Sequence, residues 1–131
     1  MKRILLAIVF LVFTITVFSQ ARIGYTEYQI RSDFSDYYFV SNYLSDGAKY
    51  ITMSNYYGAD VSYLFDSLGI CTLTFVSPYD NDALNTYAKL YSDNYTQVSD
   101  TEWKIYTENG ILTVKLLIGV GKPSFIIYAE K

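Results

Sequence analysis

The chain has 131 residues, with 15 Tyr, 8 Phe, one Trp, one Cys and no His, and a net charge of −3. Without His, no Ser-His-Asp or Cys-His catalytic pair can form within the chain, and no imidazole can bind a metal. A single Cys excludes an internal disulfide and a Cys-based zinc site. We therefore expect a protein that is not an enzyme and that holds no metal or cofactor.

The N-terminus has the pattern of an export signal. Two basic residues precede an uncharged run from Ile4 to Phe18, which is shorter than the ~20 residues that a membrane-spanning helix needs. Small residues then predict cleavage before Gln20 or Arg22, so residues 1–19 form a signal peptide. The short run and the basic pair resemble bacterial export signals, and we expect a periplasmic or extracellular protein. An uncleaved N-terminal anchor is the alternative.

Residues 20–131 would then form the mature protein. They keep 8 basic and 13 acidic residues, a net charge of −5. This balance argues against nucleic acid and against an anionic membrane surface as partners, because both require clustered basic residues. The mature part shows no repeat, linker or low-complexity tract, and we expect one compact domain without membrane insertion.

The first predicted elements are a helix and four strands. Thr26 and Gln29 have the spacing of a capping box, which predicts a short helix from Glu27 to Phe34. Hydrophobic residues then alternate with period two, and turns containing Gly recur every eight to twelve residues, the pattern of successive hairpins. The predicted strands are Tyr37–Leu44, Lys49–Tyr56, Val61–Asp66 and Ile70–Ser77.

A longer helix is predicted from Asp82 to Asn94. Asp80 and its neighbours follow Pro78 and suit a helix N-cap, where carboxylates meet the positive end of the dipole. The opposite side of this helix is polar, so it should lie on a sheet rather than be enclosed by one. Its apolar stripe has the spacing of one helix face and consists of Leu84, Tyr87, Ala88, Tyr91 and Tyr95.

Strands return in the C-terminal part. Asn109-Gly110 is a strong hairpin signal between two of them. The predicted strands are Trp103–Thr107, Ile111–Ile118 and Ser124–Glu130, with a short additional one over Thr96–Ser99. The fold class is therefore α+β, an antiparallel sheet of about seven strands with both helices packed on one face. A half-barrel that curls around the longer helix is the alternative.

Strict alternation predicts which side chains share a face of the sheet. It places Cys71 with Leu73 and Phe75, and we expect a small buried thiol there. On the other face it places Thr72 and Thr74. If Ile51 and Met53 point into the core, the same rule sends Tyr50, Thr52, Ser54 and Tyr56 to the opposite face.

A sheet face rich in Tyr, Ser and Thr admits two interpretations. These residues favour strands, so the face could be merely structural. They are also typical of adaptable binding surfaces. The leading hypothesis is an exported, non-enzymatic module that binds a protein or a glycan. Its candidate binding residues are Tyr37, Tyr43, Tyr50 and Tyr56.

Two further hypotheses belong to other classes. The acidic balance would suit an inhibitor or immunity-type protein that binds a basic enzyme of the cell envelope. A hydrolase that uses only carboxylates is the less favoured one, and it would need two or more acids in a concave site.

Overall fold

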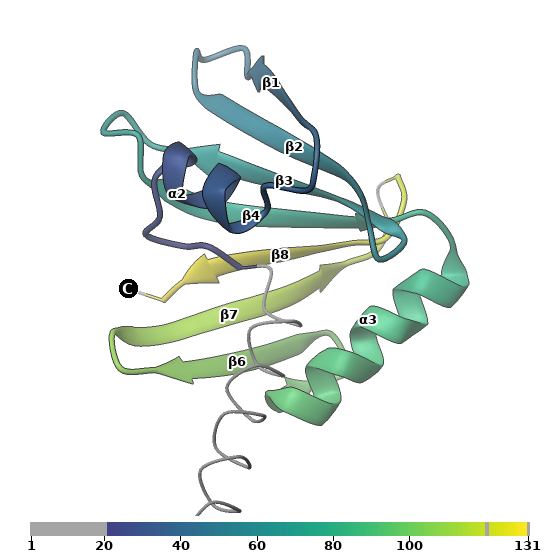
Figure 1. The fold of residues 1–131 in the computed structure, drawn as a ribbon. Coiled ribbons are helices and arrows are strands. Elements are labelled where there is room, and N and C mark those ends of the chain that lie inside the picture. Colours follow the sequence, from purple (N-terminus) through teal and green to yellow (C-terminus); the bar gives the residue numbers. More distant parts are fainter. Residues whose placement is uncertain (1–20, 120, 131) are drawn as a thin grey trace, which may run out of the picture.

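The computed structural model describes residues 21–119 and 121–130. They form an antiparallel sheet of eight strands and two helices, which confirms the α+β class (Figure 1). The helices are α2 (Glu27–Asp33) and α3 (Asn81–Asn94). The strands are β1 (Phe39–Tyr43), β2 (Lys49–Tyr56), β3 (Ala59–Phe65), β4 (Cys71–Pro78), β5 (Thr96–Ser99), β6 (Glu102–Thr107), β7 (Gly110–Leu117) and β8 (Ser124–Ala129). The predicted signal peptide, residues 1–19, lies outside the described residues.

The strands are ordered β1-β2-β3-β4-β8-β7-β6-β5. Two meanders, β1 to β4 and β5 to β8, therefore meet where β4 pairs with the last strand, β8. The sheet has one strand more than the seven predicted, because the short segment Thr96–Ser99 is an edge strand in its own right. β1 forms the other edge.

Both helices begin with the predicted caps. In α2, the Thr26 hydroxyl accepts a hydrogen bond from the Gln29 amide, and the Gln29 side chain accepts one from the Thr26 amide (3.2 and 3.0 Å). In α3, the Asp80 carboxylate accepts one from the Ala83 amide at 2.8 Å. The helix bounds differ from the predicted ones by a single residue each.

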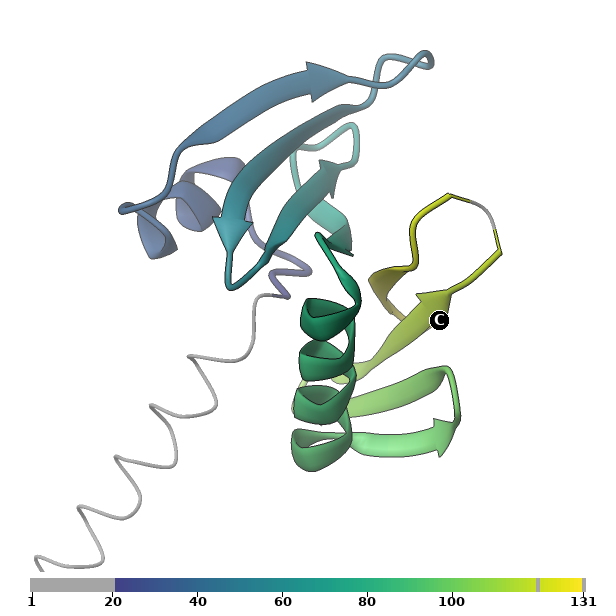
Figure 2. The ribbon, with the colours of Figure 1, turned by 90° about the vertical axis from the view of Figure 1, so that its right-hand side faces the viewer.

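Both helices cover the same face of the sheet, α2 over the first meander and α3 over the second (Figures 1 and 2). Their buried side chains belong to one core cluster with those of the sheet. Strand pairing aligns this core in cross-strand rows. One row consists of Met53, Val61, Val76 and Phe125, and the next of Ile51, Tyr63, Thr74, Ile127, Val114 and Trp103.

An extra residue in β4 changes the face of its neighbours. Leu73 pairs with Leu64 but Cys71 pairs with Phe65, so Thr72 forms a β-bulge. Cys71 and Thr74 consequently both point into the core and are buried, whereas Leu73 and Phe75 point to the opposite face. The prediction that Cys71 shares a face with Leu73 and Phe75 is therefore wrong, because the alternation is interrupted between them.

A second bulge has the same effect in β2. The pairing shifts between Met53 and Tyr56, and Asn55 takes a left-handed φ of 58°. Asn tolerates this conformation better than most residues. Tyr56 therefore pairs with Ala59 on the helix-covered face and is buried. The prediction that Tyr56 shares a face with Tyr50 is wrong for this reason.

The bulge in β4 leaves one hydroxyl in the core without a good partner. Thr74 is fully buried, and its Oγ1 makes no hydrogen bond of normal geometry within the described residues. Only the Cys71 thiol, a weakly hydrogen-bonding group, interacts with it. Thr113, also buried, instead donates to the Glu130 carboxylate and accepts from Lys104, both at 2.9 Å.

The substitution Thr74→Val should therefore stabilise the protein. Val has nearly the same shape and removes a buried hydroxyl that is poorly satisfied, so the free energy of unfolding should rise by about 1 kcal/mol. The matched control Thr113→Val removes satisfied hydrogen bonds and should lower it by a similar amount. Urea denaturation measures both. A Thr74→Val protein less stable than the original would contradict this account.

Candidate functional site

The face of the sheet opposite the helices is the candidate site. None of the described helices covers it (Figure 2). Strand pairing aligns Tyr50, Leu64, Leu73 and Tyr128 in one row across β2, β3, β4 and β8. Phe75 and Ile126 lie beside this row on the same strands β4 and β8. We call these six half-buried side chains the apolar band: Tyr50, Leu64, Leu73, Phe75, Ile126 and Tyr128.

A polar network borders the band on β6 and β7. The Lys104 ammonium donates to the Thr113 hydroxyl at 2.9 Å and to the Glu130 carboxylate, and it lies 3.4 Å from Glu102. Lys115 is 3.7 Å from the other Glu102 oxygen. Acids and bases balance within this network. The uncovered face thus has an apolar centre and a neutral, hydrogen-bonded polar border.

The structure distributes the four predicted binding tyrosines over different places. Tyr50 lies in the apolar band. Tyr43 ends the edge strand β1 and is 67% exposed. Tyr37 and Tyr56 contact each other on the helix-covered side, with ring centroids 5.3 Å apart. The four therefore do not form one surface. Sequence reasoning missed Tyr128, because only the pairing of β4 with β8 brings its segment beside the others. It missed Leu73 and Phe75, because the bulge at Thr72 moves them to this face.

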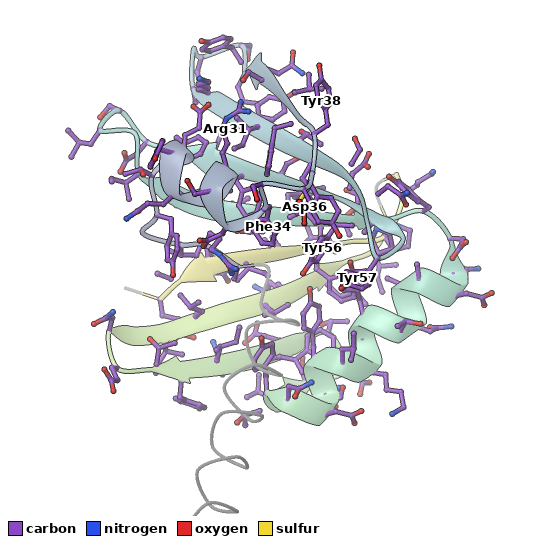
Figure 3. The ribbon with its side chains drawn as sticks, in the orientation of Figure 1. Arg31, Phe34, Asp36, Tyr38, Tyr56 and Tyr57 are labelled. Carbon is purple, nitrogen blue, oxygen red and sulfur yellow. The ribbon has the colours of Figure 1, made fainter. Side chains whose placement is uncertain are left out.

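A group of aromatic rings, separate from the apolar band, lies between the two helices (Figure 3). Tyr56 contacts Phe34, Tyr37 and Tyr57 at centroid distances of 5.5, 5.3 and 4.7 Å. Tyr57 is 66% exposed and takes a φ of 49°, which is unusual for a bulky residue. It occupies the tight turn between β2 and β3 together with Gly58, whose φ is also positive. These rings extend the packed core to the protein surface at Tyr57.

The buried phenols are not equipped for acid–base chemistry near neutral pH. Burial, together with the nearby Tyr57 and Tyr37 hydroxyls, raises the pKa of Tyr56 to about 12. Burial likewise raises the pKa of Tyr63 and Tyr87. The Tyr87 hydroxyl donates to the Tyr56 carbonyl at 2.6 Å. These phenols remain protonated at neutral pH.

A groove of about 960 Å³ opens where residues 21–25 pass the ends of β6 and β7. Ile105 and Leu112 form part of its lining. Two acids, Glu108 and Glu130, also line it. Glu130 is bonded to Lys104 and Thr113. The described residues contain no group of acids, Cys or His that could hold a metal ion. The hypothesis of a hydrolase that uses only carboxylates stays a prediction, and no pair of catalytic acids is assigned to it.

Cys71 is buried, as expected, and its thiol donates weakly to the Leu73 carbonyl at 3.5 Å. Burial raises the pKa of this thiol to about 11. At pH 7 only about one molecule in ten thousand would carry the reactive thiolate. The residue is therefore a small core side chain and no nucleophile.

The comparisons with known proteins add no family. No family model matches the chain, and neither a curated protein nor a solved structure is similar to it. Within residues 21–119 and 121–130, none of the helices is long and apolar enough to cross a membrane.

The Cys71 thiol should resist modification in the native protein. Ellman's reagent at pH 8 should label it only after denaturant is added, because both burial and the raised pKa suppress the thiolate. In a Ser67→Cys variant, which adds a thiol in an exposed turn, one thiol should react at once and the other only on unfolding. Rapid labelling of the native original chain would show that Cys71 is accessible.

Proposed function

We propose that this protein is an exported, non-enzymatic binding module that contacts a partner protein through the uncovered face of its sheet. One observation carries the proposal: a contiguous apolar band lies on a face that no described element covers. Apolar patches of this kind on soluble proteins mark interaction surfaces more often than isolated exposed residues do. The neutral polar border around Lys104 completes the usual anatomy of an interface, an apolar centre with a polar rim.

The chemistry of the band favours a protein over a glycan. Three of its six residues, Leu64, Leu73 and Ile126, are aliphatic and offer neither hydrogen bonds nor flat rings, so a stacked sugar would use only part of the band. Tyr50 and Tyr128 stand at the two ends of the row, so their hydroxyls can bond to polar groups at the edge of an apolar contact. A partner with an exposed apolar patch of its own fits this arrangement best.

Photo-crosslinking from the band should capture this partner in cells. A photoreactive p-benzoylphenylalanine at Tyr50 or at Tyr128 should yield the same adduct, identified by mass spectrometry. The matched control is Tyr28 on α2, which is 80% exposed on the helix side and should yield none. Equal adducts from all three positions, or no adduct from the band, would contradict the proposal.

The purified partner then allows a direct measurement of affinity. Leu73→Ala should weaken binding about tenfold or more if Leu73 lies at the centre of the interface. Val98→Ala on β5 removes an exposed side chain outside the band and should leave the Kd unchanged. Little dependence on salt is expected of an apolar contact. Strong salt dependence with a basic enzyme as the partner would instead favour the inhibitor hypothesis.

The predicted export signal leads to a separate prediction about the mass of the mature protein. Protein recovered outside the cytoplasm should begin at Gln20 or Arg22, because a protease that removes the signal would cut at the small residues before them. Intact-mass spectrometry of the extracytoplasmic fraction measures this. A chain that retains residues 1–19 in the membrane fraction would support the anchor alternative.

A further inference from the structure

The edge strand β1 exposes a row of backbone hydrogen-bonding groups. The Leu44 amide donates to the Ala48 carbonyl at 2.8 Å, so the polar groups of Leu44 face β2. In an antiparallel pair these groups alternate in direction along a strand. Those of Val40 and Asn42 therefore also face β2, whereas the N–H and C=O of Phe39, Ser41 and Tyr43 face outward. No described strand pairs with that side of β1.

β1 lacks the features by which proteins usually protect an edge. Residues 38–44 contain no charged residue, no Pro and no Gly, and β1 pairs with β2 without a bulge. Large side chains beside the edge are exposed: Tyr38, Val40, Tyr43 and Leu44. The other edge is shorter and less regular. β5 has only four residues, its pairing with β6 is bulged, and Asp100 follows it directly.

We propose that two copies of the protein associate by antiparallel pairing of their β1 strands, with Ser41 opposite Ser41 of the second copy. This register uses every outward backbone group, because Phe39 of each copy then pairs with Tyr43 of the other. Phe39 and Tyr43 form an aromatic cross-strand pair, and Val40 lies opposite Asn42. No charged side chain lies opposite a like charge within the paired strands. The proposal does not depend on the role of the uncovered face.

The position of Arg31 favours a second copy of this chain, rather than an unrelated peptide, as the partner of β1. Its guanidinium lies 5.3 Å from the centroid of the Phe39 ring and donates to the Ser41 hydroxyl at 3.1 Å. Glu27 accepts from it at 2.8 Å and offsets its charge. Figure 3 shows Arg31 on α2 beside the first strands. In the paired register, Tyr43 of the second copy comes beside Phe39, so its ring would add a second aromatic contact to this cation.

The same register brings like charges together at two places. The two Arg31 guanidinium groups, each bonded to a Ser41 hydroxyl, come close at the symmetry axis, where Glu27 partly offsets their charge. Asp36 precedes β1 and Asp46 lies in the turn after it. Asp36 of each copy therefore approaches Asp46 of the other copy. Each mature copy also carries a net charge of −5. All of these effects oppose association and are screened by salt. Dimerisation should therefore strengthen as the salt concentration rises.

A disulfide test can trap the pairing at its symmetry axis. Directly opposed residues in a hydrogen-bonded antiparallel pair have Cα atoms ~5.5 Å apart, within reach of a disulfide. Ser41→Cys in the full-length chain, isolated from cells that express it, should give mostly disulfide-linked dimer under mild oxidation. The original chain, whose Cys71 is buried, and Ser54→Cys, exposed on the opposite face of β2, should remain unlinked.

Solution mass provides the second test. The original chain should sediment as a dimer whose dissociation constant falls with salt. Val40→Lys, a charge on the edge, should yield monomers with unchanged melting of the fold, while Val98→Lys on β5 should leave the dimer intact. A monomeric original chain at concentrations of several hundred micromolar, or Ser41→Cys linking no faster than Ser54→Cys, would overturn the proposal. If only the photo-crosslinks from Tyr50 and Tyr128 failed, the proposed function would be contradicted and the proposed dimer would not.

Discussion

The bulge at Thr72 determines which side chains of the central strand reach the helices. β4 pairs with β3 on one side and with β8 on the other, so its pleat fixes the alignment of both meanders. A shift of one residue in a strand exchanges its two faces. With the bulge, Cys71 and Val76 both point to the helices, and Leu73 and Phe75 are left on the uncovered face. Core and candidate interface are therefore set by the same extra residue.

Local signals were sufficient for most of the elements but insufficient for the candidate site. The capping box at Thr26, the stripe of α3 and the Asn109-Gly110 hairpin depend on neighbours in sequence, and all are present in the structure. Period-two alternation assumes an uninterrupted pleat, so it misplaced Tyr56 and Thr74, which follow bulges. The band also unites segments more than fifty residues apart, and hydrophobic patterns cannot specify which strands become neighbours.

Packing explains part of the abundance of Tyr, since four of the fifteen Tyr are buried and seven are exposed. Tyr56, Tyr63, Tyr87 and Tyr91 are buried in the core, where their rings contribute area that Leu or Phe supplies in other proteins. Their hydroxyls need hydrogen-bond partners, as Tyr87 finds at the Tyr56 carbonyl. Since the apolar band holds only Tyr50 and Tyr128, its binding potential depends as much on aliphatic residues as on Tyr.

The position of β8 has a consequence for the timing of folding. The last strand of the chain lies in the middle of the sheet, between β4 and β7. Until it arrives, the first meander ends at an unpaired β4 and the second at an unpaired β7, and Phe125 and Ile127 are missing from the core. Contacts of such long sequence separation form slowly. A chain built in this way cannot complete its sheet or its core until β8 is available.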